Sequence, residues 1–195
     1  MLSRRRPGET LSALGPLGNS FQAPQEGERA VLLAGGVGMP PVLRWAENLL
    51  AFGVAPDRIV FAYGARNALE LALRDRVEDL GVRVVYATDD GSLGHKGRIT
   101  EILQAEMADA AKSGEQVRYY ACGPGAMLSA CSRITEQTGT PGQLALETAM
   151  PCGTGVCLGC IIPCRSDAAA AGEEAVFKRT CIDGPIFDAG VVLWP

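Results

Sequence analysis

Histidine is almost absent from this chain, because His95 is the only one among 195 residues. Catalysis by a Ser-His-Asp triad or by a Cys-His pair requires a histidine base beside the nucleophile. The sequence is therefore poorly supplied for general base chemistry, and we predict no catalytic side chain. Reactions in which a bound cofactor transfers electrons or hydride need no such residue.

Long apolar runs and an excess of positive charge are also missing. No stretch approaches the roughly 20 consecutive apolar residues that span a bilayer. The start, Met-Leu-Ser-Arg-Arg-Arg, turns at once to Pro7-Gly8-Glu9 and has no apolar segment of the kind found in signal peptides. The net charge of −4 argues against a surface for nucleic acid. We therefore expect no membrane, no nucleic-acid partner and a cytoplasmic location, where thiols stay reduced.

Short apolar runs alternate with helical patterns through the first three quarters of the chain. The runs predict strands at 30–34, 58–63, 82–87, 117–121 and 143–147. The periodic segments predict helices at 40–52, 66–79, 98–112 and from Pro124 to about 137, with Leu69, Leu73 and Val77 on the apolar side of the second. This alternation predicts an α/β fold with a doubly wound, parallel, five-stranded sheet covered on both faces.

Polar and glycine-rich turns follow four of these strands, and in such sheets ligands bind beyond the carboxyl ends. Gly64-Ala-Arg66 is one of these turns, and the candidate nucleotide-binding residues lie in the other three: Gly35, Gly36 and Gly38; Thr88, Asp89, Gly91 and Ser92; Cys122, Gly123 and Pro124. The first turn is not the G-x-G-x-x-G of Rossmann proteins, because Pro41 stands at the third glycine position. Its amides would still meet a helix N-terminus, which is a ready anion site. Each turn also fits an ordinary strand-to-helix connection.

Cysteines cluster near the end of the chain. Cys152, Cys157 and Cys160 have the spacing C-x4-C-x2-C, and Cys181 follows after 20 residues. This is the plant-type [2Fe–2S] spacing, in which four thiolates hold two irons. Glycines at 153, 155 and 159 let amides approach the sulfurs. A zinc site or unrelated thiols are the alternatives, although zinc more often uses two C-x2-C pairs.

Cys164 is a fifth candidate in the same region, but it follows Pro163 outside the loop. A small buried thiol is the role that we expect for it. Cys181 fits the ligand set better, since Cys181-Ile-Asp-Gly-Pro185 places it at a second turn. The periodic pattern ends near residue 148, so we predict an α/β domain at 28–147 and a cysteine-rich module at 148–195, with an exposed insertion at Ala168–Glu174.

Seven motifs in this order resemble the electron transfer subunit of dihydroorotate dehydrogenase B. They are Gly-Pro-Leu-Gly-Asn-Ser-Phe (15–21), Ala-Gly-Gly-Val-Gly-Met-Pro-Pro (34–41), Gly-Ala-Arg (64–66), Thr-Asp-Asp-Gly-Ser-Leu-Gly-His-Lys-Gly (88–97), Cys-Gly-Pro (122–124), Leu-Glu-Thr-Ala-Met-Pro-Cys-Gly-Thr-Gly-Val-Cys-Leu-Gly-Cys (146–160) and Cys-Ile-Asp-Gly-Pro-Ile-Phe-Asp (181–188).

The resemblance implies a ferredoxin reductase-like protein in pyrimidine biosynthesis. Electrons from the FMN of a partner catalytic subunit would pass through a [2Fe–2S] cluster and FAD to NAD⁺. By the same resemblance, Cys152, Cys157, Cys160 and Cys181 hold the cluster. The turns at Gly35–Gly38, Thr88–Ser92 and Cys122–Pro124 line the nucleotide side.

The chain departs from the family pattern at its N-terminus. The family carries a flavin-binding β-barrel ahead of the Gly-Pro-Leu-Gly-Asn turn, so the resemblance implies an N-terminally truncated member without the FAD-binding segment. Residues 1–27 would be the barrel edge and linker. A related NAD(P)H–ferredoxin or sulfide reductase subunit, or a non-catalytic four-cysteine zinc module, are the alternative functions.

Overall fold

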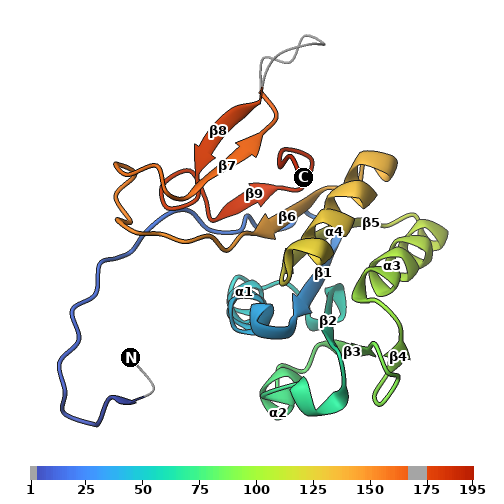
Figure 1. Cartoon of the computed structure of the whole chain (residues 1–195). Helices are drawn as coiled ribbons and strands as arrows, with labels where there is room; N and C mark the ends of the chain where they lie inside the picture. The colour runs from blue at the N-terminus through green and yellow to red at the C-terminus, as the bar shows by residue number, and fades with distance from the viewer. Residues whose placement is uncertain (1–3, 167–174) are drawn as a thin grey trace.

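The predicted α/β fold class is confirmed in the computed structural model, which describes residues 4–166 and 175–195. Seven strands form one sheet in the order β4-β3-β2-β1-β5-β6-β9 (Figure 1). Every neighbouring pair is parallel except β6 with β9. The strands are β1 (Glu28–Gly35), β2 (Ile59–Ala65), β3 (Arg83–Thr88), β4 (His95–Lys96), β5 (Gln116–Cys122), β6 (Gly142–Ala145) and β9 (Ile186–Asp188).

The five expected strands correspond to β1, β2, β3, β5 and β6, and two short strands extend the sheet at its edges. Strand β4 was missed because two residues carry no periodic signal. Strand β9 was missed because its partner β6 lies about 40 residues earlier in the chain. The predicted insertion at Ala168–Glu174 lies outside the described residues.

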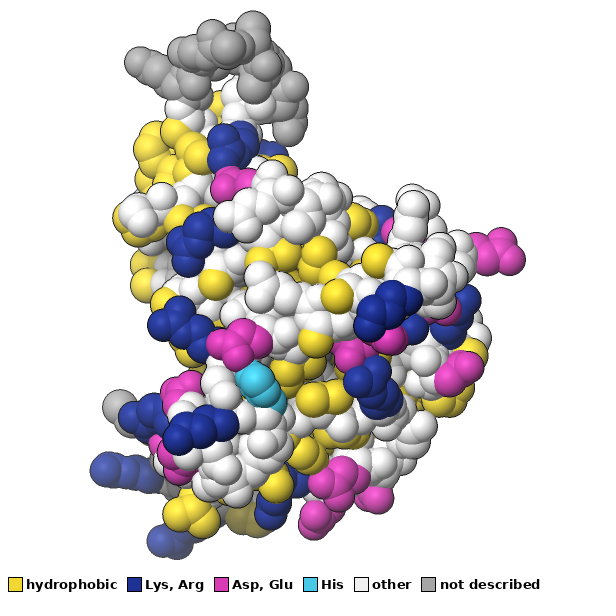
Figure 2. Space-filling model, turned by 90° about the vertical axis from the view of Figure 1, so that its right-hand side faces the viewer, with side chains coloured by type: hydrophobic (Ala, Val, Ile, Leu, Met, Phe, Trp, Pro, Cys, Tyr) yellow, Lys and Arg dark blue, Asp and Glu magenta, His cyan; other side chains and the backbone are white. Residues whose placement is uncertain are grey.

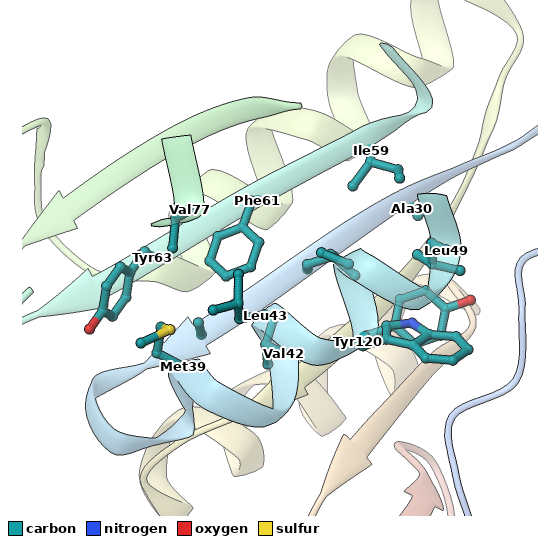
Figure 3. Packing of buried hydrophobic residues seen from close by; sticks show 14 of the residues in the cluster. Ala30, Met39, Val42, Leu43, Leu49, Ile59, Phe61, Tyr63, Val77 and Tyr120 are labelled. Atoms are coloured by element: carbon teal, nitrogen blue, oxygen red, sulfur yellow. The ribbon is translucent and has the colours of Figure 1, made fainter. Parts of the chain in front are cut away.

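Helices cover both faces of the sheet. Helices α1 (Met39–Ala51) and α2 (Arg74–Glu78) pack on one face, and α3 (Ile99–Ser113) and α4 (Gly125–Thr138) pack on the other. Figure 3 shows the first of these cores, where Phe61 and Tyr63 of β2 lie beside Leu43 of α1 and Val77 of α2. Each such side chain contributes about 1.5–3 kcal/mol when it is fully buried. Single-turn 3₁₀ helices occur at Gly36–Gly38, Pro56–Arg58 and Ala68–Glu70.

The helix predicted at 66–79 was wrong in extent. A 3₁₀ turn, whose N-cap Asn67 accepts a hydrogen bond from the Leu69 amide, comes first, and α2 forms only at Arg74–Glu78. Leu69 is 97% exposed, so it does not mark an apolar helix face. Leu71 enters the core instead, and Leu73 adopts a left-handed conformation with φ 55° that separates the two turns. Only Val77 is buried as predicted.

A two-stranded hairpin follows the loop of Cys152, Cys157 and Cys160 and stands beside the sheet (Figure 1). Its strands are β7 (Ile161–Cys164) and β8 (Val176–Arg179), which pair antiparallel. The chain then returns to the main sheet through β9. Cys164 is fully buried with Phe187 and Val192 in a small core, which fits the packing role expected for it.

The N-terminal segment is tied to the turn that follows Cys181. The Asn19 backbone amide donates to the Gly184 carbonyl over 2.7 Å. The Asn19 side chain donates to the Ile186 carbonyl over 2.9 Å and accepts from the Ile186 amide over 2.9 Å. Gly18 has φ +74°, and a Cβ there would lie 2.2 Å from the Gly184 oxygen. The two segments therefore touch backbone to backbone, which only glycine permits at position 18.

Among the described helices, none has both the length and the apolar character that a bilayer crossing requires. The longest, α3, has 15 residues.

We expect Asn19→Ala to loosen the turn at residues 183–186, because it removes both hydrogen bonds to Ile186. The loss should be about 1–3 kcal/mol, the range for a buried backbone group left without a partner. Thermal unfolding measures the stability, and hydrogen exchange should locate the change at the Ile186 amide. Asn19→Asp keeps the acceptor for that amide but sets a carboxylate oxygen against the carbonyls of Ile186 and Asp183, so it should also destabilise the turn. Unchanged stability of Asn19→Ala would contradict this role of the side chain.

Candidate nucleotide cavity and cysteine site

The predicted strand-end turns meet at one edge of the sheet. The parallel register places Gly35 beside Gly64, Ala34 beside Cys122 and Ala65 beside Thr88. Residues from β1, β2, β3 and β5 therefore form one continuous row. The four turns meet because β3, β2, β1 and β5 are neighbours in the sheet, although β5 does not directly follow the other three along the chain.

A cavity of about 400 Å³ opens at this edge, between the strand ends and the first turns of α3 and α4. Its volume is within the usual range for a small-molecule site. Four of the predicted nucleotide residues line it: Gly35, Gly36, Asp89 and Pro124. The other lining residues are Gly64, Ala65, Arg66, Glu70, Ala87, Gly97, Arg98, Ile99, Thr100, Ala126, Met127 and Ala130.

Three other predicted residues hold the Thr88–Ser92 loop in shape instead. Thr88 is fully buried, and its hydroxyl donates to the Leu93 carbonyl over 2.9 Å. The Ser92 hydroxyl donates to the Asp90 carboxylate and accepts from the Ala68 amide over 2.8 Å. The hydrogen bonds that the Ser92 hydroxyl and amide donate to Asp90 lower the pKa of its carboxyl. Gly91 has φ +78°, which suits the turn.

Gly38, Gly123 and Cys122 form a backbone contact behind the cavity. A Cβ on Gly38 would lie 2.1 Å from the Cys122 carbonyl oxygen and 2.7 Å from the Gly123 nitrogen. The turn after β1 and the turn after β5 can approach this closely only with glycine. Burial, with a smaller contribution from Glu147, raises the pKa of the Cys122 thiol to about 11, so it stays protonated at neutral pH.

Polar side chains also line the cavity wall; the sequence pointed to Asp89 and to the turn of Arg66, but not to Glu70, Arg98 and Thr100. The Arg66 guanidinium pairs with Glu70 over 2.7 Å, and the pairing lowers the pKa of that carboxyl. Arg98 and Thr100 come from the first turn of α3, whose unpaired amides favour negative charge. Arg98 stands at the start of the predicted helix and follows a strand-end loop, and this position is the signal that could have identified it.

A second cavity, of about 360 Å³, lies on the other side of Pro124. Pro124 lines both cavities, so they are neighbours. The second is bounded by Gly123, by Glu147 after β6, by Ile162 of β7 and by Trp194 near the end of the chain. The hydroxyl oxygen of Thr148, also in its wall, is buried without a hydrogen-bond partner. This cavity therefore separates the sheet edge from the cysteine module.

The structure brings the four predicted ligand cysteines together as two pairs. The sulfurs of Cys160 and Cys181 lie 3.3 Å apart. Cys152 and Cys157 are linked by hydrogen bonds from the Cys157 amide and thiol to the Cys152 sulfur. Within residues 4–166 and 175–195, no three Cys, His, Asp or Glu side chains form a group that could hold one metal ion. The two contacts, Cys160 with Cys181 and Cys152 with Cys157, arrange the four donors two by two.

Backbone amides point at these sulfurs. The Thr154 amide donates to Cys152 Sγ and the Gly159 amide donates to Cys157 Sγ, each over 3.4 Å. The Cys157 amide and that of Thr154 lower the pKa of Cys152 to about 5, which favours the thiolate that binds metals. Gly153 and Gly155 have φ +69° and +77°, so glycine permits the path of the loop.

The second pair lies deeper than the first. Cys160 and Cys181 are buried, whereas Cys152 is half-buried and Cys157 is exposed. The Cys181 amide and thiol lower the pKa of Cys160, and the neighbouring Cys160 raises the pKa of Cys181. Of the four thiols, that of Cys157 is therefore exposed and those of Cys160 and Cys181 are buried.

Two family descriptions match the chain. Residues 147–193 match the iron-sulfur cluster binding domain of dihydroorotate dehydrogenase B, and residues 32–133 match the oxidoreductase NAD-binding domain. The first match contains the four cysteines. The second contains the three strand-end turns.

Individual relatives carry the name of the same family. The dihydroorotate dehydrogenase B (NAD(+)) electron transfer subunit of Bacillus caldolyticus is 37% identical over 195 residues, which cover 99% of this chain and 69% of that protein. The corresponding homologue of Aquifex aeolicus is 34% identical and is matched over 95% of this chain and 66% of its own length.

Among solved structures, an NADH-dependent reduced ferredoxin-NADP oxidoreductase superposes with a TM-score of 0.77 at 28% identity, covering 99% of this chain and 64% of that one. The chain thus spans about two thirds of the length of these proteins.

We expect Gly38→Ala to destabilise the protein strongly, because the added methyl group meets backbone atoms that have no room to move. The cost should be about 3 kcal/mol, at the upper end of overpacking effects. Gly36→Ala is the control: its φ is +51° but no atom lies within 4 Å of the added carbon. It should cost only about 1 kcal/mol of backbone strain. Chemical denaturation measures both, and a smaller cost at Gly38 would disprove the close contact.

Proposed function

This chain belongs to the family of electron transfer subunits of dihydroorotate dehydrogenase B, and we propose that it carries electrons between a [2Fe–2S] cluster and NAD(H). Family membership also implies FAD, which exchanges hydride with a nicotinamide and single electrons with a cluster. A role in pyrimidine biosynthesis, in the cytoplasm, completes the proposal. The observation that carries it is the return of Cys181 to the loop of Cys152, Cys157 and Cys160.

The paired cysteines fit a two-iron cluster. Such a cluster takes two thiolates on each iron, so it needs two pairs of sulfurs rather than four donors around one point. The pairs Cys152 with Cys157 and Cys160 with Cys181 have this grouping. Amide donors to the sulfurs stabilise their negative charge. A structural zinc ion instead needs its four donors around a single centre.

The strand-edge cavity fits a dinucleotide. Gly35 and Gly36 expose backbone at the point where α1 begins, and the first turns of α3 and α4 close the other side. Amides at helix N-termini favour a pyrophosphate. The adjoining second cavity would receive the nicotinamide end, because it lies between Pro124 and the cysteine module. The chain would thereby hold the nicotinamide on the side of the second cavity at Pro124 and the cluster on the side of the cysteine module.

Exposed apolar side chains surround the cysteine loop and support docking of a catalytic partner subunit there. Val156 is 80% exposed and Leu158 56% exposed, and Met150 and Ile182 lie beside them in the loop and the following turn. Cys157, the exposed ligand, lies among them. Exposed apolar patches of this kind mark interaction sites. A dihydroorotate dehydrogenase subunit is the partner that the names of the relatives suggest.

A related reductase subunit is the second candidate, and its support is the solved ferredoxin-NADP oxidoreductase with a TM-score of 0.77. The two functions differ in the protein that exchanges electrons at the cluster. Co-purification and assay with a dihydroorotate dehydrogenase catalytic subunit separates them: NADH formed from dihydroorotate supports the first. Activity with ferredoxin alone supports the second.

Substituting a ligand cysteine should remove the cluster. We expect Cys157→Ser to abolish the visible absorbance of the anaerobically purified protein and to lower its iron and sulfide content at least several-fold. Cys164→Ser is the matched control, because Cys164 is buried in a separate small core and is not a proposed ligand. It should keep the absorbance. The reverse outcome would overturn the ligand assignment, and zinc without iron in the wild-type protein would replace the cluster with a zinc site.

Filling the strand-edge cavity should block nucleotide binding. Gly36→Leu places a side chain at the cavity wall, where no protein atom opposes it, and we expect NADH affinity to fall at least tenfold. Gly81→Leu is the control, since Gly81 also has a positive φ and open space but lies outside the cavity. Both variants share the backbone strain, so only Gly36→Leu should change the dissociation constant in calorimetry. Equal affinities would place the nucleotide elsewhere.

A further inference from the structure

One arginine lies directly beside the cysteine loop. Arg179 ends β8 and is the cross-strand partner of Ile161, which follows Cys160. A Cβ on Gly155 would lie 3.3 Å from the Arg179 guanidinium. Two residues further on, Cys181 completes the ligand set. The guanidinium therefore lies against the loop at Gly155, and its residue is two positions from Cys181.

A carboxylate holds this guanidinium in place. Arg179 Nε donates to Asp183 Oδ2 over 3.2 Å, and a terminal nitrogen donates to Asp183 Oδ1 over 3.4 Å. The Arg179 amide donates to the same carboxylate over 2.7 Å. The Arg179 side chain is 39% exposed, so it is partly shielded from solvent. A forked, two-oxygen contact of this kind fixes the orientation of an arginine.

The electrostatic consequence extends to the sulfurs. The pKa of Arg179 is raised, first by the hydrogen bond to Asp183 and then by other nearby charges, among them the thiolates of Cys181 and Cys160. Gly155, which the guanidinium approaches, also donates its amide to the Cys181 sulfur, so the guanidinium and this sulfur lie against the same residue of the loop.

We propose that Arg179, held by Asp183, is a positioning residue that raises the reduction potential of the cluster by placing positive charge beside Cys160 and Cys181. Reduction adds one electron and one negative charge to the sulfur-bound irons, and no bond forms or breaks. A nearby cation stabilises the more negative form. This inference rests on the proposed function, because it requires the cluster. It adds a residue that is not itself a ligand.

Replacement of Arg179 tests the idea. The full chain is purified anaerobically and titrated with dithionite, and the reduced cluster is followed by its electron paramagnetic resonance signal. We expect Arg179→Gln to lower the midpoint potential, with the equilibrium constant for reduction falling about three- to tenfold, where tenfold is about 59 mV for one electron. Arg179→Lys keeps the charge and should restore most of the potential.

Two further variants separate charge from structure. Asp183→Asn removes a negative charge from the same place and can still accept the hydrogen bond of the Arg179 amide, so its potential should rise. Arg44→Gln breaks an exposed ion pair with Glu47 on α1, outside the cysteine module, and should leave the potential unchanged. Because Arg179 is partly exposed, higher salt should reduce the shifts. A merely structural role would not give opposite shifts for Arg179→Gln and Asp183→Asn.

The outcomes distinguish this inference from the proposed function. Wild-type protein without iron and sulfide would overturn both. A wild-type cluster with the same potential in Arg179→Gln, Asp183→Asn and Arg44→Gln would overturn the role of Arg179 alone. If Arg179→Gln does not assemble a cluster, Asp183→Asn decides: a rise in potential supports the inference and an unchanged potential overturns it.

Discussion

The antiparallel pairing of β6 with β9 determines where the cysteine site forms. Leu144 lies opposite Phe187, and Ala145 lies opposite Ile186. The chain leaves β6 toward the loop of three cysteines and enters β9 from the turn of Cys181. Because the two strands run in opposite directions, the segment after one must lie beside the segment before the other. Cys181 therefore meets the loop, whereas Cys164 is carried away on β7 into a separate core.

The same pairing connects the two halves of the proposed electron path. Strand β6 also pairs with β5, whose end carries the Cys122 turn at the nucleotide edge. The cysteine module is thus held to the sheet beside the turn that lines the cavities. Pro124 borders both cavities, and Ile162 of the hairpin borders the second. Hydrogen bonding within one sheet therefore joins the two proposed sites.

Surface character differs between the two halves. Hydrophobic side chains gather on the hairpin end of the molecule (Figure 2), where Phe177 is 65% exposed. Around the cysteine loop, the exposed side chains of Val156 and Leu158 extend this hydrophobic surface to the thiols. Toward the cavity, charged groups are paired, as Arg66 is with Glu70. An apolar surface beside the thiols suits a protein partner, and a cavity with charged side chains in its wall suits a nucleotide.

The sequence by itself determined the fold class, the five central strands and the four cysteines proposed as ligands, because apolar alternation and cysteine spacing are local signals. It did not determine which strand-end residues face the cavity. Asp89 faces it and Ser92 does not, since hydrogen bonds to Asp90 and Ala68 hold Ser92 in the loop. It also could not show that Arg179 lies against Gly155. Only the tertiary structure decided these, because they depend on contacts between segments that strand pairing brings together from distant parts of the chain.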